Sequence, residues 1–181
     1  MSSRTGRVLC YNRPRVMKQL WSPWRMAYIE ERNTEGGCLF CNRREEAPGP
    51  ASLILHRGPL AFVILNRYPY TNGHVMVVPN AHVPSLEDLD SATLAELMVL
   101  ARRGLRALRQ AYGAEAFNLG VNIGAPAGAG VVDHVHLHVV PRWAGDTNFM
   151  ATTAATRVIP EDLEQTFLRL SQAWRALPAE D

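Results

Sequence analysis

The sequence predicts an α+β fold, in which a mostly antiparallel sheet of five strands is combined with two main helices. Five short extended runs are rich in branched aliphatic residues, and three of them precede the first helical pattern. Two longer segments keep apolar residues at helical spacing. The order is three strands, a helix, two strands and a helix, without an internal repeat, and it favours the α+β class.

The first three strands are expected between residues 52 and 79. Ser52–His56 and Ala61–Asn66 are extended runs separated by Arg57-Gly58-Pro59, which is typical of a hairpin. A third strand, His74–Val78, is expected to stop at Pro79, because proline has no N–H to donate to a ladder.

Two amphipathic helices are expected. The first follows Asp90 or Ser91, either of which is a favourable N-cap. Its apolar side keeps helical spacing at Leu94, Leu97, Met98, Ala101, Leu105 and Leu108. Its other side is expected to be a solvated face carrying Arg102, Arg103, Arg106 and Arg109. The second helix is expected over residues 161–177.

The fourth strand, Phe117–Ile123, and a loop of small residues lead into the fifth strand, Asp133–Arg142. Alternation with period two places His134, His136 and His138 on one face and the aliphatic residues on the other. Adjacent imidazoles cannot all be charged at low cost, so at least one is expected to be neutral. A neutral, oriented imidazole is a nucleophile, a base or a metal ligand, so this face is the predicted active site.

The composition is that of one soluble globular domain, with 47% hydrophobic residues, 20% charged residues and a net charge of +2. Residues 1–17 are expected to be a flexible basic lead-in, and residues 18–181 a single domain ending in a helix. The lead-in is too short for a nucleic-acid arm, so no nucleic-acid partner is expected. Apolar runs fall short of the roughly 20 residues of a membrane span. No signal peptide is evident, so a cytoplasmic location away from membranes is expected.

Tryptophans flank the predicted sheet on both sides. The segment around Trp21 and Trp24 is rich in large apolar residues and is expected to dock on the domain. Trp21, Trp24 and Trp143 either line a base pocket or pack in the core, and packing is the commoner role of such aromatic residues.

A Cys38-x-x-Cys41 pair suggests a metal centre, because two thiolates at this spacing can share one zinc ion. His82 and His134 are the candidates for the two remaining ligands of a closed tetrahedral site. The alternative is a free redox dithiol, but such motifs prefer a helix N-terminus after a strand, and Gly36-Gly37 favours a zinc turn. Structural zinc is therefore expected.

The two remaining histidines beyond the lead-in are assigned to the structure. His74 opens a buried strand, and buried polar groups are normally paired, so it is expected to be a satisfied core imidazole. His56 is likewise expected to be structural.

The loop before the histidines suggests phosphate chemistry. Gly124, Gly128 and Gly130 let the main chain approach an anion, and Asn122 can add an amide donor. A neutral imidazole beside such a loop can attack phosphorus while the loop stabilises the charge of the transition state. Neither a P-loop nor an acidic Mg²⁺ cluster is evident, so an NTPase is not expected.

The chain resembles the histidine triad family on several motifs. His134-Val135-His136-Leu137-His138-Val139-Val140 matches the family signature, in which histidines alternate with hydrophobic residues. Residues 65–69 and 73–79 resemble its nucleoside-binding strands, and Asn122-Ile123-Gly124 its Asn-x-Gly loop. The resemblance covers about residues 52–150. The Trp-Ser-Pro-Trp-Arg-Met start and the Pro-Arg-Trp-Ala-Gly-Asp after the triad are similar to the bacterial diadenosine tetraphosphate phosphorylase-like branch.

This resemblance implies roles for the triad. His136 would attack the α-phosphorus and form a nucleotidyl-histidine intermediate, and His138 would donate hydrogen bonds to the phosphate or the bridging oxygen. His134 would orient His136, partly through its backbone carbonyl. Asn66 would hold the ribose hydroxyls and Asn122 a phosphate oxygen. The phosphate loop would comprise Gly124, Gly128, Ala129 and Gly130.

The resemblance also implies a metal centre and an assembly. In zinc-containing relatives the ligands correspond to Cys38, Cys41, His82 and His134, the four residues chosen above on ligand chemistry. The family is dimeric, and two five-stranded sheets join into one sheet of ten strands. No organic cofactor is expected.

The chain departs from the family pattern in the loop before the triad. Hydrolytic and phosphoramidase branches carry a Gln there, and the phosphorylase-like branch is expected to have a Ser near Gly130; here Ala129 and Gly130 fill the stretch. A missing donor costs on the order of 1–3 kcal/mol of phosphate affinity where no water replaces it. It also leaves room for a second anion, which mildly favours inorganic phosphate over water as the acceptor.

Three functions are therefore considered. The first is a nucleotidyl transferase that splits diadenosine tetraphosphate or a related dinucleoside polyphosphate by phosphorolysis. The second is a hydrolase that uses the same site on dinucleoside polyphosphates or adenosine phosphoramidates. The third is a nucleotide-binding protein with vestigial catalysis, which the missing loop donor favours and the intact triad opposes.

Overall fold

The computed structural model describes residues 37–146 and 161–178. The predicted flexible lead-in, residues 1–17, and the predicted docking segment around Trp21 and Trp24 lie outside the described residues.

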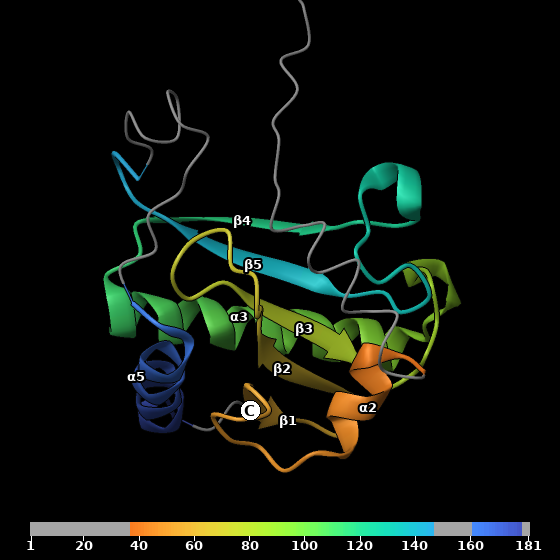
Figure 1. The fold of residues 1–181 in the computed structure, drawn as a ribbon, viewed down its shortest axis with the longest axis horizontal. Coiled ribbons are helices and arrows are strands. Elements are labelled where there is room, and N and C mark those ends of the chain that lie inside the picture. Colours follow the sequence, from red (N-terminus) through yellow and green to blue (C-terminus); the bar gives the residue numbers. More distant parts are fainter. Residues whose placement is uncertain (1–36, 147–160, 179–181) are drawn as a thin grey trace, which may run out of the picture.

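A five-stranded sheet forms the centre of the molecule (Figure 1). Its strands are β1 (Ile54–Arg57), β2 (Ala61–Leu65), β3 (Val75–Pro79), β4 (Ala116–Val121) and β5 (Leu137–Arg142). The spatial order is β1-β2-β3-β5-β4, and all four pairings are antiparallel. The predicted hairpin and α+β class are confirmed. β5, the last strand among the described residues, is inserted between β3 and β4, which places the histidine motif in the middle of the sheet.

Two long helices confirm the predicted amphipathic segments. They are α3 (Ser91–Tyr112) and α5 (Leu163–Ala176). Asp90 caps α3 by accepting a hydrogen bond from the Thr93 N–H at 2.7 Å, and Gly113 ends it in the left-handed conformation at φ 59°. Asp162 caps α5 in the same way through the Gln165 N–H at 2.8 Å. Two short 3₁₀ turns, η1 (Leu86–Asp88) and η2 (Ala125–Ala127), lie in the connections.

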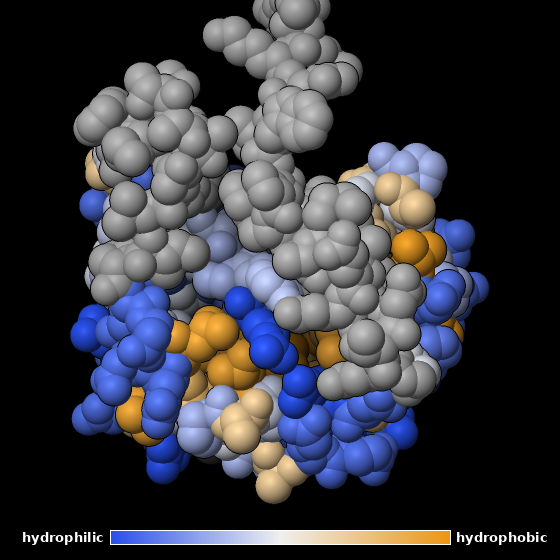
Figure 2. All heavy atoms as spheres, viewed as in Figure 1, coloured by the Kyte–Doolittle hydropathy of each residue, from blue (hydrophilic) through white to orange (hydrophobic). Residues whose placement is uncertain are grey.

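The sheet has two different faces. Val75, Val77, Leu137 and Val139 belong to a buried core under α3 and α5, and Figure 1 shows α3 crossing behind the sheet. Met76 and Val78 of β3 belong to a second, smaller core on the opposite face, together with Phe62, Ile64 and Phe40. Figure 2, drawn from the same side as Figure 1, shows apolar side chains bordered by polar ones. Because β3 pairs Met76 with His138, the triad face is the one away from the long helices.

The histidine segment is only partly a strand, which corrects the prediction of a strand over 133–142. β5 begins at Leu137, so His134 and His136 precede the ladder. The pairing of β3 with β5 ends at Val77↔Leu137, and the N–H of Val135 donates instead to the carbonyl of Val83 at 2.8 Å. The main chain before β5 is therefore hydrogen-bonded to the connection that follows β3.

A short helix, α2 (Leu39–Glu45), replaces the tight turn predicted around Cys38 and Cys41 and part of the loop predicted over 43–50. Its one fully buried side chain, Phe40, packs into the second core. Burial of this ring on the triad face explains why the segment folds against the sheet.

Only some of the arginine side chains of α3 are fully exposed to solvent, which corrects the prediction of a uniformly solvated face. Arg102 and Arg106 are exposed as predicted. Arg103 instead donates to three carbonyl oxygens at the end of α5: Trp174 at 3.1 Å, Leu177 at 3.2 Å and Pro178 at 2.6 Å. The last carbonyls of a helix lack partners within it, so a neighbouring guanidinium is a natural donor.

Candidate active site and metal centre

Four predicted metal ligands come together from three separate segments. Cys38 lies immediately before α2 and Cys41 in its first turn, whereas His82 follows β3 and His134 precedes β5. Their ligand atoms all lie within 4.8 Å of one another. The Nδ1 atom of His134 is 3.3 Å from Sγ of Cys38 and 3.3 Å from Nδ1 of His82. Sγ of Cys41 is 3.4 Å from Nδ1 of His82.

These separations fit a tetrahedral zinc site. Zn–S bonds of about 2.3 Å and Zn–N bonds of about 2.0 Å place the ligand atoms of a tetrahedron roughly 3.3–3.8 Å apart. Nε2 of the buried His134 ring lies 2.9 Å from the carbonyl oxygen of Pro79 and donates to it. The lone pair is therefore on Nδ1, toward the thiols, and a metal-binding histidine commonly donates its other ring N–H to a main-chain carbonyl in this way. The donor set fits zinc.

A zinc turn was predicted for the thiol pair, but Cys38 is the N-cap residue of α2, so the pair lies at a helix N-terminus. The preference for zinc now depends on the two imidazoles beside the thiols, since a dithiol motif does not require them.

The second histidine of the triad has a defined orientation. Nδ1 of His136 lies 2.9 Å from the carbonyl oxygen of His134, and a carbonyl can only accept, so Nδ1 carries the proton. In the neutral ring, Nε2 then holds the lone pair. The ring is buried and contacts Phe40, with centroids 4.9 Å apart, and His138, with centroids 4.8 Å apart.

The third histidine forms a pair with a histidine outside the motif. Nδ1 of His138 lies 2.9 Å from Nε2 of His74. Burial, and secondarily the neighbouring imidazoles, lower the pKa of His74 to about 3. Burial and then the charge of His136 lower the pKa of His138 to about 4. Both rings are therefore neutral at pH 7, as the crowding of imidazoles predicts.

His74 belongs to the candidate site, although only a structural role was predicted for it. It is a satisfied buried imidazole, as predicted, but its partner belongs to the triad. Strand parity could have revealed this, because His74 is two residues before Met76, and Met76 pairs with His138. His56 lies elsewhere, with its ring 5.3 Å from that of Trp174 on α5.

The predicted nucleotide-binding residues surround the triad unevenly. Asn66 has its Nδ2 atom 3.3 Å from Nδ1 of His74, and its Oδ1 accepts the N–H of Tyr68 at 2.9 Å. Gly120 pairs with His138, and Asn122 lies two residues further on, just beyond the end of β4. Asn66 is thus brought beside the His74–His138 pair.

The small-residue loop is folded on itself rather than open. Gly124 and Gly128 have φ values of 79° and 89°, which require glycine. The N–H groups of Ala127 and Ala129 donate to the carbonyl of Gly124, and that of Gly128 to Ala125. Several donors expected to face a phosphate are therefore bonded within the loop.

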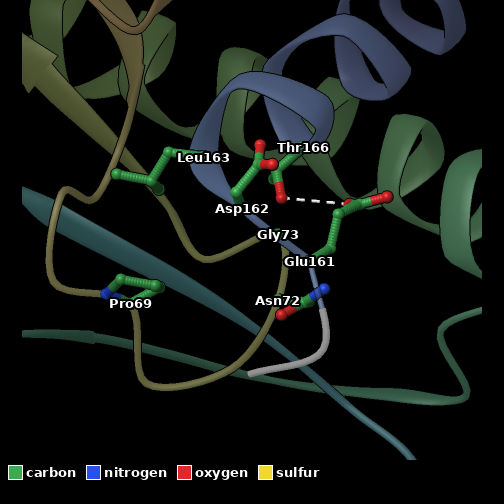
Figure 3. A pocket seen from close by; sticks show the side chains of 7 residues that line it. All are labelled: Pro69, Asn72, Gly73, Glu161, Asp162, Leu163 and Thr166. Atoms are coloured by element: carbon green, nitrogen blue, oxygen red, sulfur yellow. Dashed lines mark hydrogen bonds between the residues drawn. The ribbon is translucent and has the colours of Figure 1, made fainter. Parts of the chain in front are cut away.

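A cavity of about 350 Å³ lies apart from the triad, between the β2–β3 connection and the start of α5 (Figure 3). It is lined by Pro69, Asn72, Gly73, Glu161, Asp162, Leu163 and Thr166. Its walls carry none of the predicted site residues. Trp143 also lies away from the triad: its Nε1 donates to the carbonyl of Tyr112 at 3.1 Å and its ring packs on the main core. Trp143 is therefore a packing residue.

Comparison with known proteins identifies the family. The family model of the HIT domain matches residues 49–145, which is more than half of the chain. The chain belongs to the HIT family. The HIT match begins after Cys38 and Cys41, so the two thiol ligands lie outside it.

Relatives of this HIT protein include enzymes with phosphorylase and hydrolase names. It is 37% identical over 169 residues to "AP-4-A phosphorylase" of Mycobacterium tuberculosis, covering 90% of this chain and 87% of that protein. It is 35% identical over 95 residues to the asymmetrical bis(5'-nucleosyl)-tetraphosphatase of Schizosaccharomyces pombe, covering 52% of each. A crystal structure of a Zn-bound histidine triad family protein from Mycobacterium smegmatis matches with a TM-score of 0.62 and 31% identity, covering 77% of this chain and 94% of that one.

Among the helices of residues 37–146 and 161–178, none combines the length and the apolar character that crossing a membrane requires.

Proposed function

We propose that this HIT enzyme is a nucleotidyl transferase that cleaves diadenosine tetraphosphate or a related dinucleoside polyphosphate by phosphorolysis. The observation that carries the proposal is the hydrogen bond from Nδ1 of His136 to the carbonyl of His134, because it leaves a neutral nucleophilic Nε2 on the triad face. The similarity to the mycobacterial AP-4-A phosphorylase over most of both chains supports the choice of substrate class.

The reaction has two balanced steps. Nε2 of His136 attacks the α-phosphorus, a P–N bond forms, and the bond from that phosphorus to the bridging oxygen breaks, so ATP leaves. An oxygen of inorganic phosphate then attacks the same phosphorus, the P–N bond breaks, and ADP is released. As Nε2 bonds to phosphorus the ring becomes positive, and its Nδ1–H donates more strongly to the carbonyl of His134.

The other site residues bind and orient the substrate. His138 donates a hydrogen bond to the phosphate or to the departing bridging oxygen, and Asn66 binds the ribose hydroxyls. Asn122 contacts a phosphate oxygen. Phosphate charge is further compensated by the loop of Gly124, Gly128, Ala129 and Gly130, through those N–H groups that its internal hydrogen bonds do not already use.

Zinc is proposed as a structural ion held by Cys38, Cys41, His82 and His134. When bound, it would link α2 to the two segments that flank the central strands, and it would supply folding free energy rather than chemistry. The short distances between four pairs of these ligand atoms and the Zn-bound mycobacterial relative support this assignment.

A homodimer in the cytoplasm is proposed as the functional form, with the two sheets joined at β4. This strand lies at the edge of the sheet, and its residues are mostly exposed or half-buried, in contrast to the fully buried β2 and β3. An uncovered edge is a ready site for pairing with a second copy.

The alternative function is hydrolysis at the same site, which the similarity to the yeast tetraphosphatase favours. Product analysis with diadenosine tetraphosphate, with and without inorganic phosphate, separates the two. ADP and ATP formed only with phosphate support phosphorolysis, whereas AMP and ATP in both samples show a hydrolase. Absence of products would reject both and favour phosphoramidates or a binding role.

A further inference from the structure

The buried ring of His74 lies against the triad although it belongs to no part of the histidine motif. His74 is 0% exposed, and its ring centroid is 5.1 Å from that of His138. A fully buried imidazole needs a partner for each ring nitrogen. One nitrogen of His74 faces the main chain and the other faces His138, so the environment of each can be read separately.

The main chain determines which nitrogen of His74 carries the proton. The N–H of Tyr70 lies 3.1 Å from Nδ1 of His74, and Nδ2 of Asn66 lies 3.3 Å from the same atom. A main-chain N–H can only donate, so Nδ1 of His74 must present its lone pair. The proton of the neutral ring is therefore on Nε2.

The tautomer of His74 determines the tautomer of His138 in the triad. Nε2–H of His74 points at Nδ1 of His138, 2.9 Å away, so Nδ1 of His138 must accept. Neutral His138 then carries its own proton on Nε2, on the side of the ring away from His74. The low pKa values of both rings, about 3 and about 4, agree with one proton on each.

Ring packing restrains His74 and His138 from flipping, which would exchange the positions of their ring nitrogens. The ring of Tyr70 lies 4.5 Å from that of His74 and is stacked on that of His138 at 5.9 Å with an interplanar angle of 24°. The ring of His138 also contacts that of His136, with the ring centroids 4.8 Å apart. The pair is therefore enclosed by aromatic neighbours as well as hydrogen-bonded.

We propose that His74, oriented by the main chain of Tyr70, is a positioning residue that fixes His138 in the Nε2–H tautomer needed to donate a hydrogen bond to the departing polyphosphate oxygen. The identity of that oxygen rests on the proposed function, but the tautomer does not. In the opposite tautomer His138 would present a lone pair to the oxygen, and the contact would change from attractive to repulsive.

Two substitutions separate the hydrogen bond from the packing. His74→Phe keeps a flat ring but removes the donor to His138, whereas the side-chain amide of His74→Gln can still donate from the position of Nε2. His56→Gln makes the same chemical change at a histidine that packs on Trp174 and serves as the matched control.

The first readout is the protonation of each ring nitrogen of His138, observed by ¹⁵N NMR of histidine-labelled, substrate-free protein. The wild type, His74→Gln and His56→Gln are expected to carry the proton on Nε2, and His74→Phe to show a mixture of tautomers. The second readout is turnover of diadenosine tetraphosphate with phosphate. His74→Phe is expected to lower kcat on the order of 10²-fold, the usual scale for one positioned donor, with little change in KM. His74→Gln is expected to recover most of the loss.

The outcomes are distinguishable. A single Nε2–H tautomer in His74→Phe would overturn the proposal, even where activity falls through a packing defect. A mixed tautomer with unchanged kcat would overturn it as well. Should His74→Phe not fold, the wild-type spectrum still decides, since a proton on Nδ1 of His138 would contradict the hydrogen-bond chain. A wild type that does not cleave dinucleoside polyphosphates would refute the proposed function and leave the NMR test of the tautomer intact.

Discussion

The ring nitrogen Nδ1 of His136 donates to the carbonyl oxygen of His134 over 2.9 Å, while the ring of His134 itself faces the two cysteine thiols. One residue therefore contributes its side chain to the candidate metal centre and its main chain to the candidate nucleophile. Any shift of His134 on loss of a metal ion would move the acceptor that sets the tautomer of His136. The candidate metal centre and the candidate active site of this HIT protein therefore share a residue and are joined directly.

Substitution of the nucleophile should separate binding from chemistry. We expect His136→Ala to lower kcat for diadenosine tetraphosphate by at least on the order of 10³-fold, because a group that forms a covalent intermediate has no substitute. AMP should still bind, since the proposed ribose and phosphate contacts come from other residues. Phosphate-dependent ADP formation and calorimetric titration with AMP measure the two effects. Retained turnover in this variant would reject the covalent mechanism.

Loss of one thiol ligand should destabilise the fold. We expect Cys41→Ser to lower the melting temperature and the zinc content of the purified protein, because a structural zinc ion contributes folding free energy. Chelation of the wild type should lower the melting temperature in the same way. Cys10→Ser, in the predicted N-terminal lead-in outside the described residues, is the matched control and should change neither quantity. If Cys41→Ser melts like the wild type but loses catalysis, the metal is not structural.

Acid should destabilise the protein through the buried histidines. Burial lowers the pKa of His74 to about 3 and that of His138 to about 4, below the ordinary histidine pKa of about 6.5 that applies in the unfolded chain. The unfolded state therefore binds more protons between pH 6.5 and pH 4, and stability falls with decreasing pH in that window. Each histidine contributes up to about 1.4 kcal/mol per pH unit, and above pH 6.5 this contribution to the pH dependence disappears.

Urea unfolding of the wild type and of His74→Gln at pH 7 and pH 5 measures this effect. The drop in unfolding free energy from pH 7 to pH 5 should be smaller in His74→Gln, because this variant lacks one histidine whose pKa is lowered in the folded state. The difference between the two proteins cancels the effect of acid on the metal ligands, which both retain. Equal drops would show that His74 does not resist protonation in the folded state.

The contact of Arg103 with the end of α5 should contribute measurable stability. Arg103→Ala removes donors from the carbonyls of Trp174, Leu177 and Pro178 and exposes the indole beneath the guanidinium. We expect a loss of about 1–3 kcal/mol of unfolding free energy, because partly buried carbonyls lose partners. Gln110→Ala, at an exposed position of the same helix, should change it by less than about 0.5 kcal/mol. Equal effects of the two substitutions would contradict the capping role.

Local sequence signals determined the face of the triad, the limits of α3 and the candidate zinc ligands. The alternation of histidines with aliphatic residues placed the triad on one face, because strand parity depends only on neighbouring residues. Asp90 and Gly113 fixed the limits of α3 through short-range capping. Residue chemistry selected Cys38, Cys41, His82 and His134, since few side chains bind zinc.

Long-range packing decided the rest. Sγ of Cys38 and Nδ1 of His134 meet across 96 positions of sequence, and His74 meets His138 across 64, because β5 inserts beside β3. The start of β5 at Leu137 depended on where the ladder to β3 ends, and the role of Arg103 depended on where α5 ends. Propensity and periodicity specify which way a side chain points. They do not specify what stands opposite it, because that is set by the register and docking of elements far apart in the chain.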